Sequence, residues 1–244
     1  MATNALPSAN HASAVRSSQS RAPMRDDLAS VPWLGLIEAD HQARVVADLR
    51  VIDVQPGEVL CRVGRAAVWW LGVIDGLLKM SNDSTDGLPI TFTGITSGGW
   101  FGEGTVLKNE VYRYNIQALR PSVVAGIPTD TFYWLLGRSI AFNRFVMNQL
   151  NERLGQFIAA REIDRLTHPD ERVARNLAAL FHPVLYPGVG ERLRITQQEL
   201  GYLVGLSRQR VNEALTALDA AGVIRVEYGG VRVLDLDRLR RYAA

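Results

Sequence analysis

Residues 195–215 read ITQQELGYLVGLSRQRVNEAL, and this stretch predicts two short helices joined by a tight turn. Thr196 is a good N-cap and Glu199 stands at the third helical position, so the two can form a capping box at the start of the first helix. Three apolar residues at helical spacing then give that helix one buried stripe, namely Leu200, Leu203 and Val204. We therefore expect the first helix to begin near Thr196.

A second helix is predicted after the turn. Gly205 supplies the backbone freedom that a sharp bend needs, and Ser207 can cap the next helix. Gly222 stands where a left-handed C-terminal cap is expected, about four turns further on. Residues 223–234 then alternate apolar and polar side chains around Gly229-Gly230, which predicts a tight hairpin. Two helices and a hairpin make a winged helix, which argues against the alternative of an ordinary amphipathic helical pair.

The polar face of the second helix carries residue types that can read DNA. The first residues of a recognition helix reach base edges in the major groove. Arginine can grip guanine, and glutamine or asparagine can grip adenine, so Arg208 is the first candidate for a base contact. Arg210, Thr196 and Gln197 are suggested as phosphate contacts. The predicted DNA-contacting residues are Thr196, Gln197, Ser207, Arg208, Gln209, Arg210, Asn212 and Glu213.

The same stretch resembles the signature of the Crp/Fnr family of bacterial transcription regulators. The family pattern T-x-x-E-[IL]-G-x-x-[VL]-G-x-S-R-x-x-V-x-x-x-L is matched at every fixed position from Thr196 to Leu215. The resemblance implies a regulator that binds double-stranded DNA as a homodimer, with RNA polymerase as a further partner. Gln209 and Glu213 stand where the Crp branch carries glutamate and arginine, so that branch's operator preference is not transferred.

Residues 51–128 contain many glycines between short apolar runs, a pattern typical of many short strands. Asp75-Gly76 is interpreted as a hairpin turn, which favours antiparallel pairing. The predicted fold class is α+β, with an N-terminal antiparallel β-roll of the double-stranded β-helix or jelly-roll type. A metal-dependent enzyme on such a roll would need clustered histidines and carboxylates. All four histidines lie outside it, and neither catalytic residues nor metal ligands are predicted.

In the Crp/Fnr family this roll resembles a cyclic-nucleotide pocket, with a G-E-[LI]-[GA] turn and an arginine ten residues after the glutamate. The resemblance implies that Glu103 bonds a ribose hydroxyl and that Arg113 pairs with a phosphate. Tyr114 departs from the pattern, because a phenol fills the space of a cyclic phosphate unless it turns away. The alternative is that Glu103 and Arg113 pair with each other. The predicted effector residues are Gly102, Glu103, Gly104, Arg113 and Tyr114.

The cofactor is left open between a cyclic nucleotide, another effector and none. A single cysteine, Cys61, cannot hold an iron–sulfur cluster, which needs several thiolates. Haem is not expected, because the roll offers only Cys61 and Met80 as axial ligands. No run approaches the roughly 18 apolar residues that span a membrane, so we expect a cytoplasmic protein without a membrane partner. The formal net charge of +2 means that DNA affinity would need a local basic patch.

The segment from Ala141 to Arg165 contains no proline and predicts a long helix. Its apolar residues follow alternating spacings of three and four, as in a coiled-coil seam. The predicted dimer interface is Met147, Leu150, Leu154, Phe157 and Arg161. The alternative is a helix docked on its own roll. The resemblance favours the dimer, with recognition helices in consecutive major grooves of a palindromic site.

His168-Pro169-Asp170 interrupts the helical pattern, and we place the hinge between the two halves there. The predicted domains are a disordered tail (1–28), a cyclic-nucleotide-binding-like β-roll sensor (29–140), a dimerisation helix (141–166) and a winged helix-turn-helix (167–244). The main hypothesis is a sequence-specific transcription regulator whose roll biases DNA binding. One alternative is a ligand-sensing module that acts through protein contacts. Another is a constitutive regulator with a vestigial pocket.

Overall fold

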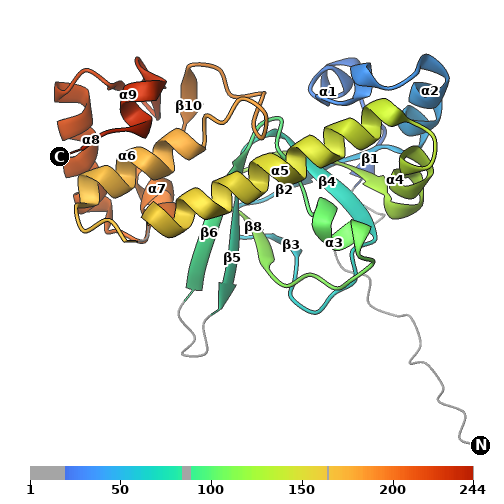
Figure 1. Cartoon of the computed structure of the whole chain (residues 1–244), viewed down its shortest axis with the longest axis horizontal. Coiled ribbons are helices and arrows are strands. Elements are labelled where there is room, and N and C mark those ends of the chain that lie inside the picture. The colour runs from blue at the N-terminus through green and yellow to red at the C-terminus, as the bar shows by residue number, and fades with distance from the viewer. Residues whose placement is uncertain (1–19, 84–88, 164, 244) are drawn as a thin grey trace, which may run out of the picture.

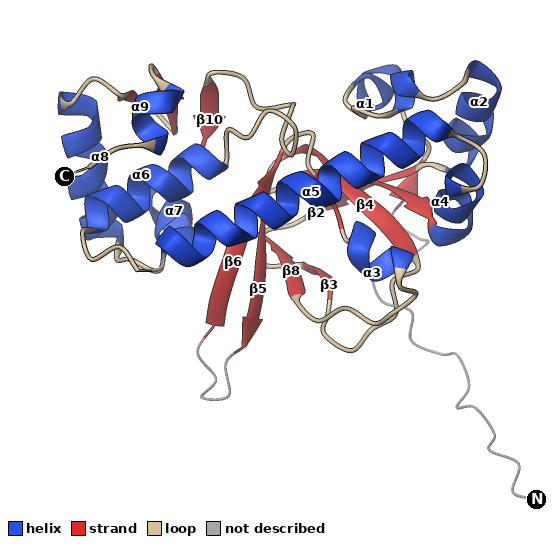
Figure 2. Cartoon of the chain, viewed as in Figure 1, coloured by secondary structure: helices blue, strands red, loops and turns tan. Residues whose placement is uncertain are grey.

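The structure is a computed structural model that describes residues 20–83, 89–163 and 165–243. A β-roll with helices at one end is followed by the long helix α5 (Ile140–Ile163) and by a C-terminal domain of helices and a small sheet. Figure 1 shows α5 crossing the molecule diagonally from the roll to the C-terminal domain. Figure 2 shows most strands of the roll gathered below α5 and the helices at both ends of the molecule. The predicted α+β architecture is confirmed.

The roll consists of two antiparallel sheets. Its strands are β1 (Ser20–Arg21), β2 (Arg50–Val54), β3 (Val59–Cys61), β4 (Trp69–Asp75), β5 (Leu77–Asp83), β6 (Pro89–Thr96), β7 (Trp100–Phe101), β8 (Asn115–Ala118) and β9 (Ser122–Pro128). One sheet has the order β1-β2-β9-β4-β7 and the other has the order β3-β8-β5-β6. The two sheets enclose an apolar core that includes Leu71, Leu78, Ile95 and Ile116.

The hairpin predicted at Asp75-Gly76 is wrong. β4 pairs with β9 and β7, whereas β5 pairs with β6 and β8, so the chain crosses from one sheet to the other at Gly76. Gly76 has a φ of +123°, and a Cβ there would lie 2.2 Å from Ser122 Oγ. The glycine is needed for this close crossing and for its positive φ, not for a two-residue turn.

Helices cover the end of the roll from which α5 starts. They are α1 (Arg25–Ala29), the short 3₁₀ helix η1 (Leu34–Leu36), α2 (Ala39–Asp48) and α4 (Thr129–Leu136), while α3 (Glu103–Leu107) lies beside α5. An aromatic cluster fills the space between these helices and the five-stranded sheet, and the ring centroids of Trp70 and Trp100 lie 4.4 Å apart. Phe142 of α5 belongs to the same cluster, so the start of the long helix is anchored in the roll.

The tail predicted for residues 1–28 is wrong for its last part, residues 20–28. Ser20 pairs with Ile52 across the sheet, and Arg21 forms an ion pair with Asp27. The carboxylate of Asp27 also accepts a hydrogen bond from the Met24 amide at 2.7 Å. Order here comes from strand pairing, an ion pair and one apolar residue, Leu28, which packs against the aromatic cluster, and so few contacts leave little signal in the composition. Residues 1–19 lie outside the described part of the chain.

The C-terminal domain contains α6 (Pro169–Ala179), β10 (Arg192–Arg194), α7 (Gln197–Val204), α8 (Arg208–Ala220), β11 (Ile224–Glu227), β12 (Gly230–Val233) and α9 (Leu236–Arg240). The helical break predicted at Pro169 is confirmed, because α5 ends at Ile163 and Pro169 is the first residue of α6. The sheet has the order β10-β12-β11, so the predicted hairpin gains a third strand. Its turn is Tyr228-Gly229, one residue earlier than predicted, because Gly230 already pairs with Glu227.

Candidate DNA-binding and effector sites

The caps predicted for the helix-turn-helix are confirmed. Thr196 Oγ1 accepts a hydrogen bond from the Glu199 amide at 3.2 Å, and Glu199 Oε2 accepts one from the Thr196 amide at 2.7 Å. Gly205 ends α7 with a φ of +68°. Ser207 Oγ then accepts a hydrogen bond from the Arg210 amide at 3.2 Å and caps α8. Local sequence signals therefore determine both helix starts and the turn between them.

The first turns of α8 expose a polar face together with the start of α7. Arg208, Gln209, Asn212 and Glu213 are exposed. Gln197 joins the two helices, because its Nε2 donates to Asn212 Oδ1 at 2.5 Å and its Oε1 accepts from Arg208 Nε at 3.5 Å. The structure therefore brings the predicted DNA-contacting residues together on one surface of the C-terminal domain.

Arg210 sits between two carboxylates. Its Nη1 donates to Glu213 Oε2 at 2.7 Å, and its Nη2 donates to Asp170 Oδ1 at 2.9 Å. The hydrogen bond from Arg210 lowers the pKa of Glu213, and the same bond raises the pKa of Arg210. Arg210 is therefore a cation whose charge is already compensated in this state, and a phosphate would have to replace a carboxylate partner.

Glu103, the predicted effector ligand in the roll, is buried against α5. It is 1% exposed and follows Gly102, whose φ is +86°. Arg153 of α5 donates to Glu103 Oε1 at 2.8 Å through Nε and to the Trp100 carbonyl at 2.7 Å through Nη2. Burial disfavours the charge of Arg153, but the attraction of Glu103 outweighs it and raises the pKa of the guanidinium. Glu103 Oε2 and Arg153 Nη1 are buried without a partner among the described residues.

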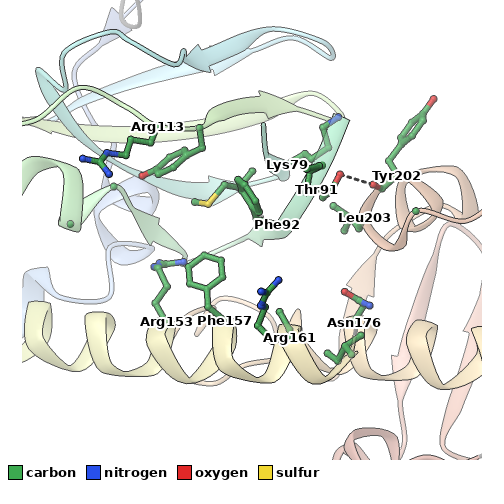
Figure 3. Close-up of a pocket in the computed structure, with 18 of the residues that line it drawn as sticks. Lys79, Thr91, Phe92, Arg113, Arg153, Phe157, Arg161, Asn176, Tyr202 and Leu203 are labelled. Atoms are coloured by element: carbon green, nitrogen blue, oxygen red, sulfur yellow. Dashed lines mark hydrogen bonds between the residues drawn. The ribbon is translucent and has the colours of Figure 1, made fainter. Parts of the chain in front are cut away.

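The pairing considered for Glu103 and Arg113 is wrong. Arg113 Nη2 instead lies 3.1 Å from Glu110 Oε2, and the Arg113 side chain is 76% exposed. Figure 3 shows Arg113 on the strand side of the cavity, while Arg153 and Phe157 extend from α5 on the opposite side. The helix therefore supplies the guanidinium that neutralises Glu103, and Arg113 faces solvent.

Tyr114 does not turn away from the predicted pocket. Its hydroxyl lies 3.5 Å from Thr105 Oγ1 and 3.7 Å from the position that a Cβ on Gly102 would occupy. Burial raises the pKa of the phenol to about 12, so the group is neutral at physiological pH. The ring therefore lies over the glycine turn where the family pattern expects a small hydroxyl residue.

A cavity of about 1090 Å³ extends from this site to the helix-turn-helix. One end is lined by Glu103, Tyr114 and Arg153, and the other end is lined by residues of α6 and α7, among them Arg172 and Leu203. Figure 3 shows strands on one side and α5 on the other, with Tyr202 and Leu203 closing the far end. The effector site predicted in the roll is thus one end of a longer space that borders both domains.

Two sequence profiles and several relatives match this architecture. Residues 51–139 match the cyclic nucleotide-binding domain, and residues 171–242 match the Crp-like helix-turn-helix domain. The chain belongs to the Crp/Fnr family of bacterial transcription regulators. The cAMP-activated global transcriptional regulator CRP of Pasteurella multocida is 28% identical over 166 residues, which cover 66% of this chain and 78% of CRP.

A second curated relative also matches the chain, and a solved structure shares its fold. Transcriptional regulator SdrP of Thermus thermophilus is 27% identical over 177 residues, which cover 70% of this chain and 82% of SdrP. FixK2 from Bradyrhizobium japonicum has the same fold, with a TM-score of 0.64 at 16% identity over 80% of this chain and 96% of FixK2. The present Crp/Fnr protein is thus a DNA-binding transcription regulator with an effector-binding domain of the cyclic-nucleotide type, and not an enzyme.

The predicted dimer residues of this Crp/Fnr regulator lie on different sides of α5. Met147 and Leu154 are about 60% exposed. Leu150 and Phe157 are partly buried and pack against the apolar cores of the roll. Arg161 lines the cavity, and Figure 3 shows its guanidinium directed into it. The predicted residues, spaced three and four apart, therefore belong to two different stripes of α5. Met147 and Leu154 face outward, whereas Leu150 and Phe157 face the roll.

Two functional features of this Crp/Fnr regulator escaped sequence reasoning. Arg153 was missed, although Phe142, Val146, Gln149 and Arg153 form a second row at heptad spacing that is buried in the structure. Arg120 was also missed, because its contact with Glu199 joins positions that are far apart in the chain. In both cases the partner is supplied by another domain or element, and no local pattern indicates it.

The described residues contain no group of three side chains of the types that bind a metal ion. Cys61 is buried, and burial raises the pKa of its thiol to about 12. A neutral thiol is a weak metal ligand and a weak nucleophile. Within the described segments, helices long and apolar enough to cross a membrane are absent.

Proposed function

We propose that this Crp/Fnr regulator binds a two-fold symmetric DNA site as a homodimer and places α8 of each protomer in a major groove. The observation that carries the proposal is the capped helix-turn-helix, whose polar face is exposed and joined across α7 and α8 by Gln197. The dimer matches the symmetry of a palindromic site, with half-sites one helical turn apart. A DNA-binding protein of this kind acts in the cytoplasm, with RNA polymerase as its partner at the promoter.

An exposed apolar row on α5 supports dimerisation. Ile140, Met147, Leu154 and Ile158 are 58 to 69% exposed and lie on the side of the helix that faces away from the roll. They fall at heptad-compatible spacings, as coiled-coil seams require. An apolar row of this length is costly to leave in water. The partner we assign to it is α5 of a second copy, with Ile140 and Ile158 added to the seam in place of Leu150 and Phe157, which pack on the roll, and of Arg161, which lines the cavity.

The polar residues of the helix-turn-helix divide into two roles. Arg208, Gln209, Asn212 and Glu213 project from the first turns of α8 and face base edges. Thr196, Gln197, Ser207 and Arg210 lie at the two helix starts and face phosphates, which position the protein without reading sequence. Thr196 and Ser207 already cap their helices through their hydroxyl groups, and the Thr196 amide already donates to Glu199, so the neighbouring side chains Gln197 and Arg210 carry most of the phosphate contact.

The effector is not a cyclic mononucleotide bound in the way the family pattern implies. Arg113, the expected phosphate ligand, faces solvent beside Glu110. Tyr114 fills the space over the glycine turn, and Arg153 already neutralises Glu103. A cyclic phosphate placed there would have no contact with Arg113 and would overlap the phenol ring of Tyr114. The name of the Pasteurella relative describes activation by cAMP, and the placement of Arg113, Tyr114 and Arg153 favours a chain that does not respond in this way.

The proposal is tested by replacing Arg208 with alanine. On a DNA fragment from the protein's own promoter, Arg208→Ala should lower affinity by about 1 to 3 kcal/mol, which is about fivefold to 150-fold. Arg240→Ala is the matched control, because it removes the same charge from α9 of the same domain. Equal affinities of wild type and Arg208→Ala would refute the recognition role of α8.

A further inference from the structure

We propose that the connection between α6 and β10 contains a strap that ties the C-terminal domain to the roll, and that His182 holds this strap in place only while its ring is neutral. The strap comprises residues 182–189. Protonation of His182 in mild acid releases it. The inference involves neither the cavity nor the DNA contacts, so it stands apart from the proposed function. Figure 1 shows the connection reaching out to the roll before it returns to β10.

The strap inserts two side chains into the roll. Leu185 and Tyr186 are fully buried, and both belong to the apolar core that the two sheets of the roll enclose. Phe181, which directly precedes the strap, belongs instead to the core of the C-terminal domain. The chain therefore passes from one hydrophobic core to the other at His182. A change at this residue acts on the connection between the two cores.

Hydrogen bonds also fasten the strap to the roll. The Tyr186 hydroxyl donates to the Gly94 carbonyl of β6 at 2.8 Å. The Gly188 amide donates to the Ser97 carbonyl at 3.1 Å, in the turn that follows β6. A Cβ at Gly188 would lie 2.7 Å from the carbonyl carbon of Ser97, so this close approach needs a glycine. The bond from Gly188 crosses between the domains and therefore reports whether the strap is in place.

The ring of His182 caps the start of the strap. Its Nδ1 accepts hydrogen bonds from the Val184 amide at 3.3 Å and from the Leu185 amide at 3.2 Å. Its Nε2 lies 3.2 Å from Glu152 Oε2 of α5. These contacts require the neutral tautomer with a lone pair on Nδ1 and a hydrogen on Nε2. A proton on Nδ1 would face two N–H donors, so protonation turns both bonds to the strap into repulsive contacts.

The surroundings of the ring oppose its protonation in the folded protein. Burial has the largest effect and lowers the pKa of His182. Glu152 of α5 attracts the extra proton, whereas Arg240 of α9 and Arg153 of α5 repel it, and the net pKa lies below the ordinary value of 6.5. About a quarter of the side chain, 24%, is exposed, so water can deliver the proton. The stability that the neutral ring gives the strap is therefore fully present above about pH 6.5 and is lost as the pH falls below this value.

The test measures hydrogen exchange of the Gly188 amide in the full chain by NMR, relative to the intrinsic exchange rate, at about pH 7.5 and about pH 5.5. At the lower pH a histidine with an ordinary pKa is protonated about ten times more often than it is neutral. We therefore expect the protection of Gly188 to fall by up to about tenfold in the wild type. His182→Asn should keep the same protection at both pH values, because the asparagine side-chain carbonyl can accept the same two amides and does not titrate.

Two further variants make the test specific. His168→Asn is the matched control, because His168 is exposed in the same domain and lies outside the strap, and it should retain the acid response of the wild type. Glu152→Gln removes the carboxylate that attracts the proton, so its loss of protection should occur at a lower pH.

Three results would overturn the proposal. The first is a wild type in which the protection of Gly188 does not fall with acid, and the second is an equal fall in His182→Asn. The third is an equal fall at the buried Leu215 amide of α8, because acid would then unfold the whole C-terminal domain. If His182→Asn does not fold, an unshifted acid response in Glu152→Gln overturns the proposal instead.

Discussion

Arg120 and Glu199 join the roll to the helix-turn-helix. Arg120 Nε donates to Glu199 Oε1 at 2.8 Å, and Arg120 Nη2 donates to Glu199 Oε2. Both side chains are largely buried, with 14% and 11% of their surface exposed. Glu199 Oε2 also accepts from the Thr196 amide and closes the capping box of α7. The Glu199 carboxylate therefore caps α7 of the helix-turn-helix and also fixes α7 to the roll.

Breaking this contact from the roll side should loosen the domain interface. Arg120→Gln removes the bidentate donor and leaves the capping box of α7 intact. We expect a loss of about 1.5 to 3 kcal/mol in the free energy of unfolding, the range for a hydrogen bond to a charged group, measured as a lower urea midpoint. Arg194→Gln is the control, because its 3.9 Å pair with Asp75 also joins the two domains but is exposed. Equal shifts of the urea midpoint in Arg120→Gln and Arg194→Gln would refute the conclusion that the buried Arg120–Glu199 pair stabilises the domain interface.

The acid dependence of stability should reveal Glu199. Burial raises its pKa, but hydrogen bonds from Arg120 and Thr196 outweigh burial, and the net shift is downward. Because the pKa of Glu199 is lower in the folded than in the unfolded protein, its ionised carboxylate stabilises the fold at pH values above the unfolded pKa, which is near 4.5 for glutamate. This stabilisation is lost as the pH falls through the folded pKa. The difference in urea midpoint between wild type and Glu199→Gln should be constant near neutral pH and shrink below about pH 4.5. A difference that grows with acid would contradict the assignment.

The dimer seam can be tested on α5. Leu154→Glu places a charge in the middle of the exposed apolar row, and two such charges would face each other in a dimer. We expect the wild type to sediment as a dimer at micromolar concentration and Leu154→Glu to sediment as a monomer. Asn148→Glu is the control, because Asn148 is exposed on the same helix but lies outside the row. A monomeric wild type would contradict the dimer.

Cyclic AMP should leave the DNA affinity of this protein unchanged. The expected phosphate ligand Arg113 faces solvent, and Tyr114 lies over the glycine turn. Cyclic AMP should likewise leave the DNA affinity of Arg113→Ala unchanged, because Arg113 is not a ligand of the nucleotide. A DNA affinity that rises with cyclic AMP in the wild type and not in Arg113→Ala would show that Arg113 turns inward and Tyr114 moves aside.

Sequence patterns within a few residues predicted the helix-turn-helix well. The site around Glu103 in the roll depends on contacts between distant residues, which no such pattern indicates. The starts of α7 and α8 follow from Thr196, Glu199 and Ser207, whose hydrogen bonds span three residues. Glu103 was identified from its motif, but its partner Arg153 comes from α5, 50 residues later in the chain. The spacing of apolar residues predicted that α5 is a helix but not which stripe faces the roll, because two stripes share that spacing.

The most direct test of the account is fluorescence anisotropy of full-length protein with two labelled DNA fragments at one fixed salt concentration. One fragment comes from the protein's own promoter, and the other has the same composition in scrambled order. We expect the promoter fragment to bind about a thousandfold more tightly, the lower end of the range for specific recognition, and Arg208→Ala to narrow this difference. Equal affinity for the two fragments would contradict sequence-specific recognition by α8.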